Sequence, residues 1–281
     1  MKLKIHAICI ALNEEIFIEG LLNSLYKFCS GISIITQFDR DYYGKVIKPD
    51  ATVNRVLNYN DPAGKIHLVM RKYNDETVSR NHEMLSLISN PIKGVVPYSV
   101  PLEKIKTFHE RPDYFLIVDP DEIYDVGTFE NIVDYLADKR PKGMRVRGYN
   151  YLKKWNCRIP NDVVNFVQFG FVKPGLLFST RRVITWNEFR IKKLLSILKL
   201  PDFSAKLYGF INCPEEVGVF HHGIYLGDEE RLKQKYAKHS HQESNNPEWI
   251  SEVLNYPFDY IETSQLPVNI QKTRWPQGFI D

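Results

Sequence analysis

The sequence predicts an α/β protein with a mostly parallel central sheet, helices on both faces of that sheet and a more irregular C-terminal part. Short apolar segments typical of buried strands alternate with helical patterns in the first half of the chain, as they do in βαβ units. The second half carries strand-like segments at 144–147, 166–172 and 176–179, which we expect to include antiparallel strands. No linker or internal repeat divides the chain, which indicates one domain.

The first expected strand and helix occupy the N-terminal thirty residues. Residues 3–12 are apolar and partly β-branched, as in a buried strand. Asn13 then offers a helix N-cap, followed by two glutamates in the first turn, where the helix dipole favours anions. Gly31 is the expected end of this helix. The apolar stripe of the helix has the spacing i, i+3, i+4, i+7 and consists of Ile18, Leu21, Leu22 and Leu25.

The remaining expected elements follow in chain order. Further strands are expected at 32–35 and 66–70, and a buried strand at 114–118. The polar segment 37–64 has the composition of a long loop or insertion. Helices are expected at 74–90, where Pro91 ends the pattern, and at about 128–137. Gly227-Asp228 opens a charged helix, in which Glu229 precedes Lys233 by four residues.

Composition and charge exclude several classes of protein. The 281 residues are 43% hydrophobic and 25% charged, which is typical of a globular chain. A net charge of +3 argues against a protein that mainly wraps nucleic-acid phosphates, and leaves room for a local basic groove. No apolar run approaches the roughly 20 residues of a membrane helix. The four cysteines form no CxxC pair, so a reducing, cytoplasmic location is expected.

Several common motifs are absent. The chain has no GxGxxG, no P-loop, no GxSxG and no HExxH, which argues against dinucleotide-binding, P-loop, α/β-hydrolase and zincin chemistry. Asp119-Pro120-Asp121-Glu122 instead follows the predicted strand 114–118. Ligands of open α/β sheets bind outside the carboxyl ends of strands. Two carboxylates spaced by one residue suit a hard cation, Mg²⁺ or Mn²⁺. A solvated acidic turn that caps the next helix is the equal alternative.

Three segments in order resemble the family 2 glycosyltransferases of the GT-A fold. Residues 7–15 read as a strand that ends in Asn-Glu, Ser79-Arg80-Asn81 corresponds to the family's Ala-Arg-Asn, and 115–122 end in Asp-x-Asp. The resemblance covers about the first 130 residues. It implies a GT-A-type, Rossmann-like sheet in one domain, 1–281. Within that domain, 1–130 would bind the nucleotide sugar and 131–281 the acceptor.

The resemblance also implies roles for individual residues. Asp121 would hold Mn²⁺ or Mg²⁺, which neutralises the diphosphate leaving group, and Asp119 would face the ribose hydroxyls. Arg80 would lie near the nucleotide or orient Asp119, with a structural salt bridge as the alternative. Glu14 is assigned to the nucleobase, although it also suits a first helical turn. Asp39 is the best substitute for the family's base- and ribose-binding aspartates.

Two assignments concern the second half of the chain. His221 and His222 precede Gly223, where the family often places a His before a Gly and a basic helix. Only one of two adjacent strand residues can face the site, and His221 matches the pattern better as a metal or diphosphate ligand. An ordinary, partly buried pair is the alternative. Glu188, near Trp186, is the candidate catalytic base, with a surface glutamate as the equal alternative.

The resemblance therefore implies a metal-dependent glycosyltransferase, a hexosyl- or related transferase. We expect it to be inverting and to use a nucleotide-diphosphate sugar, first of all a UDP-sugar. The acceptor would be a glycan or another hydroxyl compound, with a lipid-linked sugar, a protein and modified DNA left open. The net charge does not indicate nucleic acid. A nucleotidyltransferase is the rival enzyme, and a sugar-nucleotide-binding module without activity is the rival of another class.

Overall fold

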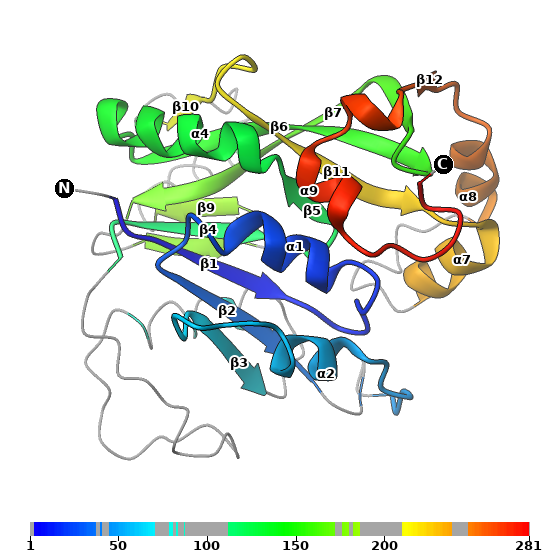
Figure 1. Ribbon diagram of the computed structural model, residues 1–281, viewed down its shortest axis with the longest axis horizontal. Helices are drawn as coiled ribbons and strands as arrows, with labels where there is room; N and C mark the ends of the chain where they lie inside the picture. Colours follow the sequence, from blue (N-terminus) through cyan, green and yellow to red (C-terminus); the bar gives the residue numbers. More distant parts are fainter. Residues whose placement is uncertain are drawn as a thin grey trace, which may run out of the picture.

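The structure is a computed structural model that places a large twisted sheet at the centre of the chain (Figure 1). It describes residues 3–37, 40, 45–70, 79–80, 83, 87, 112–171, 176–179, 182–185, 210–237 and 247–280. Among these residues, ten strands form one sheet in the order β3-β2-β1-β4-β7-β6-β11-β5, with β10 paired to β6 and β12 to β7. Strands β8 and β9 form a separate antiparallel pair.

The strands are β1 Ile5–Ile10, β2 Gly31–Thr36, β3 Ile66–Met70, β4 Tyr114–Val118, β5 Glu122–Tyr124, β6 Gly143–Lys153, β7 Cys157–Phe171, β8 Leu176–Ser179, β9 Arg182–Thr185, β10 Phe210–Asn212, β11 Val219–Leu226 and β12 Asp259–Tyr260. The described helices are α1 Ile18–Leu25, α2 Thr52–Leu57, α4 Val126–Lys139, α7 Glu229–Ala237, α8 Pro247–Leu254, the 3-10 turn η3 Thr263–Gln265 and α9 Val268–Lys272.

The predicted α/β class and mostly parallel sheet are confirmed. Strands β3, β2, β1 and β4 pair in parallel, as do β6 and β11. Strand β7 runs antiparallel to both β4 and β6, which confirms antiparallel pairing in the second half of the chain. Strands β4, β6 and β11 therefore all run in one direction, and their carboxyl ends point toward one edge of the sheet, which we call the carboxyl edge.

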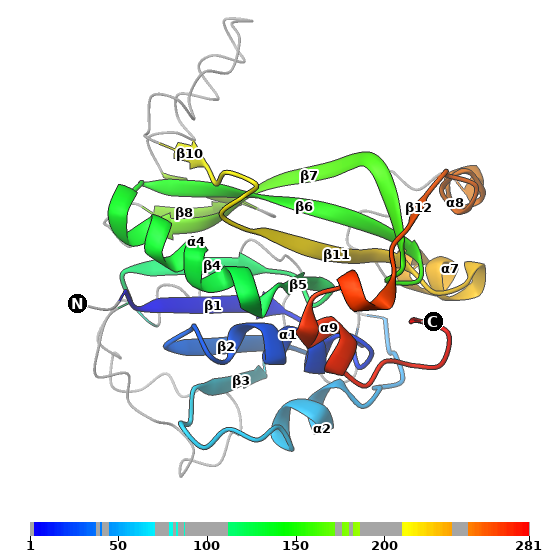
Figure 2. The same ribbon diagram turned by 45° about the horizontal axis from the view of Figure 1, so that its top comes forward.

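Helices α1, α4 and α9 cover one face of the sheet (Figures 1 and 2). The apolar stripe predicted for α1 is confirmed, because Ile18, Leu21, Leu22 and Leu25 all have 0% exposure. These residues belong to the main hydrophobic core, together with alternate residues of β1 and β4. The alternation along a strand sends one set of side chains to this face and the other set to the opposite face.

The prediction that Asn13 caps α1 is wrong. Asn13 has φ 55°, in the left-handed region, and α1 begins only at Ile18. Long-range bonds explain the difference, because the Glu14 N–H donates to Thr52 Oγ1 at 2.7 Å and the Glu15 N–H to Asp50 Oδ2 at 3.0 Å. These partners hold the chain after β1 in a loop, in competition with a helical turn.

Two further expectations are corrected. Segment 37–64 is more than a loop, since it contains α2, whose preceding residues interlock with the loop after β1. Gly31 does not end a helix, because α1 ends at Leu25 and Gly31 is the first residue of β2. The helix expected at 74–90 lies mostly outside the described residues, of which 79–80, 83 and 87 are helical.

The C-terminal segment packs back against the first helix and the end of β6. The Trp155 N–H donates to the Phe279 carbonyl at 2.9 Å, and the Trp155 and Trp275 rings lie 5.2 Å apart between centroids. In the part of the chain that the structure describes, no helix combines the length and apolar character needed to cross a membrane.

Candidate functional site

The acidic tetrapeptide lies at the carboxyl edge of the sheet, directly after β4. Its turn is closed on itself, because the Glu122 N–H donates to the Asp119 carbonyl at 3.1 Å and Glu122 Oε2 accepts from the Asp119 N–H at 3.0 Å. The chain then enters β5, a short strand that the sequence did not predict. The tetrapeptide is thus a rigid corner between β4 and β5, and the expectation of a solvated turn does not describe Glu122, which is 3% exposed.

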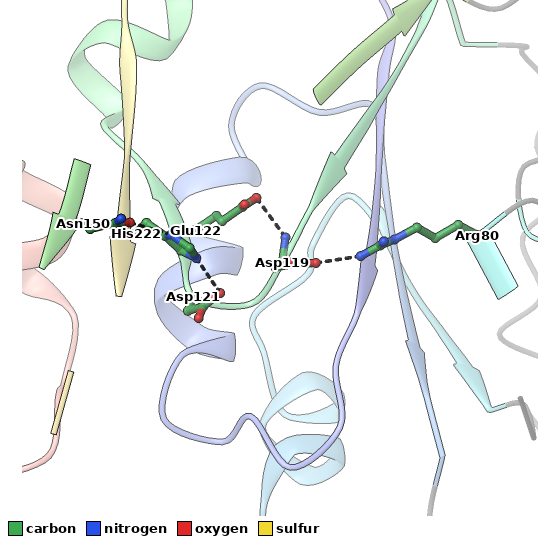
Figure 3. A network of polar contacts seen from close by, with 6 residues as sticks. All are labelled: Arg80, Asp119, Asp121, Glu122, Asn150 and His222. Carbon is green, nitrogen blue, oxygen red and sulfur yellow. Dashed lines mark hydrogen bonds and ion pairs between the residues drawn. The ribbon is translucent and has the colours of Figure 1, made fainter. Parts of the chain in front are cut away.

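Asp119 is bound by Arg80. The Arg80 Nη2 atom donates to Asp119 Oδ1 at 2.6 Å, and the Arg80 side chain has 0% exposure against 16% for Asp119 (Figure 3). This contact agrees with a residue that orients Asp119 and equally with the structural salt bridge that was the alternative. Because a buried guanidinium stays charged, Asp119 Oδ1 meets a fixed positive charge at the end of β4.

Buried polar contacts anchor the helical segment that carries Arg80. Glu83 lies one turn after Arg80, and its Oε1 accepts from Ser33 Oγ at 2.8 Å. His6 Nε2 lies 2.9 Å from Ser33 Oγ. Because the Ser33 hydrogen is given to Glu83, His6 Nε2 is the donor in the second bond. The segment is therefore fixed to β1 and β2, and Arg80 is held in place above the end of β4.

Asp121 meets β11 on the other side of the corner. Strand β5 pairs antiparallel with β11, which puts His222 opposite Glu122, and the Gly223 N–H donates to the Asp121 carbonyl at 2.8 Å. His222 Nε2 then lies 3.7 Å from Asp121 Oδ1, with side-chain exposures of 2% and 8% (Figure 3). Backbone pairing thus fixes the position of both side chains.

The second histidine of the pair has a different environment. His221 Nδ1 is hydrogen-bonded to the Tyr151 hydroxyl at 2.7 Å. Burial, with a smaller effect of Arg158, lowers the pKa of His221 to about 3, and burial raises the pKa of Tyr151. Both groups are therefore neutral at physiological pH. The structure places His222 beside Asp121, whereas the sequence favoured His221, because strand register decided which histidine faces the corner.

Gly223 allows β11 to pass close to the aromatic residues at this edge. A Cβ atom at this position would lie 2.9 Å from Phe17 Cε1, 2.9 Å from Leu226 Cδ1 and 3.0 Å from Trp155 Cη2. Real Cβ contacts are rarely this short. Packing therefore favours glycine at position 223, and the absence of a side chain lets the backbone pass next to Asp121.

Cys9 lies on β1 beside this corner and is not a reactive group. It pairs in register with Val118 and has 0% exposure. Burial raises the pKa of the Cys9 thiol, and the charge of Asp119 raises it further. A thiol of this kind stays protonated and behaves as a small apolar side chain.

The remaining expected residues are only partly accounted for. Glu14 lies in the loop after β1, where its carbonyl accepts from the Phe17 and Ile18 N–H groups at 3.0 Å. It is therefore at the carboxyl edge, but not in the first turn of α1. Asp39 and Glu188 lie outside the described residues. Lys233 is 2.7 Å from Glu229 on an exposed helix face, which confirms the predicted pair.

Two residues of the network were missed by sequence reasoning. Asn150 Oδ1 lies 2.8 Å from His222 Nδ1, and both side chains are 2% exposed. The sequence indicated Glu122 only as part of an acidic turn. In the structure, its Oε2 accepts a hydrogen bond from the Asp119 N–H. No spacing in the sequence indicates the role of Asn150, because it depends on the pairing of β6 with β11.

The described side chains supply few metal donors. Within the described ranges, no group of three or more His, Cys, Asp or Glu side chains is arranged to hold a metal ion. The carboxylate of Asp121 and the imidazole of His222 form a pair of potential donors, with Oδ1 and Nε2 3.7 Å apart. These two donors could provide only part of a coordination sphere.

Comparison with solved structures finds S. aureus TarS among those similar to this chain. A TarS structure of residues 1–349 gives a TM-score of 0.40 at 13% identity, over 90% of this chain and 69% of that chain. The same piece in complex with UDP-GlcNAc gives 0.41 at 13% identity, over 90% and 70%. Against a longer TarS chain the match covers 42% of that chain. No family model matches the sequence, and no match was found among curated proteins. Similarity at this level assigns no family.

Proposed function

We propose that the chain is a glycosyltransferase that moves a sugar from a nucleotide-diphosphate sugar to an acceptor hydroxyl. The observation that carries the proposal is the corner after β4, where Asp119 is held by buried Arg80 and Asp121 faces His222 at 3.7 Å. The two carboxylates of the motif thus face different partners, and we propose that they have different roles. The corner also lies at the carboxyl edge, where open α/β sheets bind nucleotides.

The donor set of Asp121 and His222 fits a divalent cation. One carboxylate and one imidazole suit Mn²⁺, and Mg²⁺ is commonly held by one or two carboxylates together with substrate phosphates. Asp121 and His222 would hold the cation, and the donor's diphosphate would supply further oxygen ligands. A cation bound in this way would supply charge neutralisation for the departing nucleoside diphosphate. Asp119, oriented by Arg80, would accept from a ribose hydroxyl.

The reaction we propose is a displacement with inversion. The acceptor oxygen forms a bond to the anomeric carbon, while the bond from that carbon to the diphosphate oxygen breaks and its electron pair leaves with the nucleoside diphosphate. The acceptor proton passes to a carboxylate, for which we propose Glu188. The acceptor is a glycan or another hydroxyl compound.

The decisive experiment measures donor turnover with several nucleotide sugars, UDP-sugars first, in the presence and absence of Mn²⁺. Release of free sugar and nucleoside diphosphate, dependent on the cation, would support the transferase. Release of pyrophosphate from a nucleoside triphosphate and a sugar phosphate would instead identify a nucleotidyltransferase. Donor binding without turnover under all conditions would indicate a binding module.

A matched pair of variants tests the site assignment. Asp121→Asn removes the anionic oxygen with little change of volume, so calorimetry should show loss of Mn²⁺-dependent UDP binding. Asp113 lies at the opposite end of β4, where its Oδ2 accepts from the Lys4 N–H at 2.9 Å. Asp113→Asn makes the same chemical change away from the corner and should bind UDP normally. Equal affinities for the two variants would contradict the role of Asp121.

A further inference from the structure

Asn150 and His222 lie directly opposite one another on the paired strands β6 and β11. Figure 3 shows His222 between Asn150 and Asp121, so that its two ring nitrogens face different partners. Asn150 Oδ1 is 2.8 Å from Nδ1, and Asp121 Oδ1 is 3.7 Å from Nε2. As whole residues, Asn150, His222 and Asp121 are 2%, 2% and 5% exposed. The imidazole orientation is thus set in a buried environment.

The contact with Asn150 determines which nitrogen carries the proton. An amide oxygen can only accept a hydrogen bond, so Nδ1 must be the donor. A neutral imidazole has one N–H, and its other nitrogen then holds a lone pair. We infer that Asn150 is a positioning residue that keeps the His222 proton on Nδ1 and directs the Nε2 lone pair toward Asp121.

The opposite orientation of the amide would create a different site. If Asn150 donated through Nδ2, Nδ1 would be the acceptor, and the N–H would move to Nε2, facing Asp121. His222 would then be a donor to the Asp121 carboxylate and could not bind a cation through Nε2. Asn150 therefore selects between a cation-binding pair and a hydrogen-bonded Asp–His pair.

The neutral amide of Asn150 suits the role of keeping the proton of His222 on Nδ1. Histidines that bind metals usually donate their other N–H to a fixed acceptor, which holds the tautomer and the ring plane. A carboxylate in place of Asn150 would add a negative charge and favour the doubly protonated imidazolium, which has no lone pair. The part of this inference that concerns a cation rests on the proposed function, whereas the position of the proton does not.

Nuclear magnetic resonance of the imidazole nitrogens tests the position of the proton without substrate or metal. Long-range ¹H–¹⁵N spectra of the whole chain are recorded at about pH 8, above the ordinary imidazole pKa of about 6.5, and a His222→Gln variant identifies the signals of His222. The expected result is a protonated Nδ1 and an unprotonated Nε2. A wild-type spectrum with the proton on Nε2 would overturn the inference.

Variants test whether Asn150 is the cause. Asn150→Ala should shift His222 toward the Nε2–H tautomer, whereas Asn150→Asp, which restores an acceptor oxygen, should keep Nδ1 protonated. Asn156 is the matched control, because it is a buried amide whose Nδ2 donates to the Ile261 carbonyl and to Thr263 Oγ1. Asn156→Ala should leave the His222 signals unchanged. An Asn150→Ala spectrum identical to that of Asn156→Ala would also overturn the inference.

A Mn²⁺ titration in the presence of UDP connects the tautomer to the site. Asn150→Ala should weaken Mn²⁺ binding by about 10- to 100-fold, as measured for other positioning partners of metal-bound histidines, while Asn156→Ala should not weaken it. Wild-type protein that shows the Nδ1–H tautomer but binds no Mn²⁺ would support the inference about Asn150 and reject the cation in the proposed function. The two failures are therefore distinguishable.

Discussion

The two aspartates of the acidic corner should differ in their effect on stability. Asp119→Asn removes the anion that faces Arg80, whose side chain has 0% exposure. Removing one partner of a buried ion pair costs about 3–5 kcal/mol. Because Asp119 is itself 16% exposed, water screens part of the loss, and we expect about 3 kcal/mol. In Asp121→Asn, the contact that is lost is the one between Asp121 Oδ1 and His222 Nε2, whose distance of 3.7 Å exceeds hydrogen-bond length, so we expect its loss to cost less than about 1 kcal/mol.

These energies convert into a measurable difference in melting temperature. An unfolding entropy of about 2 cal/mol/K per residue gives roughly 0.6 kcal/mol/K for the 281 residues. Asp119→Asn should therefore melt about 5 °C below the wild type, and Asp121→Asn within about 2 °C of it. Circular dichroism without ligand measures both values. With UDP and Mn²⁺ added, Asp121→Asn should be the variant that gains no stabilisation.

A double variant separates the ion pair from other effects of Asp119. Arg80→Met replaces the guanidinium by an unbranched apolar side chain, so Asp119→Asn should cost much less in that background than in the wild type. Equal costs in the two backgrounds would show that Asp119 stabilises the fold by another route. A melting temperature of Asp119→Asn that equals that of Asp121→Asn would refute the reasoning from the buried pair.

Three further predictions follow from single groups. Burial, with a smaller effect of His67, lowers the pKa of His6 from 6.5 to about 3. Between these pH values the unfolded chain therefore binds a proton that the folded chain excludes. The free energy of unfolding should fall as the pH drops from 6.5 toward 3, by up to about 5 kcal/mol. Urea unfolding of His6→Gln should lack this part of the slope, and parallel profiles would contradict it. Gly223→Ala should cost about 1–3 kcal/mol by overpacking against the rings around it and weaken Mn²⁺ binding; a normal melting temperature would argue against the tight packing. Glu188→Gln should retain donor binding and lose about 10²- to 10⁴-fold in kcat, and wild-type transfer would eliminate Glu188 as the base.

The sequence by itself determined the local elements and the position of the acidic corner. The strands expected at 66–70 and 114–118 have those bounds in the structure, because short apolar segments between polar ones favour strands, although Ile66–Met70 is only half-buried. The apolar stripe of α1 and the Glu229–Lys233 pair follow from helical spacing alone. A carboxylate motif directly after a buried parallel strand must lie at the carboxyl edge, so its place could also be predicted.

Only the tertiary structure decided which groups face one another at that corner. His222 rather than His221 meets Asp121, and Asn150 meets His222, because β11 lies between β5 and β6 in one particular register. A shift by a single residue would exchange the two histidines. Asn13 likewise does not cap a helix, because the loop after β1 is hydrogen-bonded to residues in 48–52. Pairings between segments far apart in the chain arise from packing of the whole sheet, which local sequence patterns do not encode.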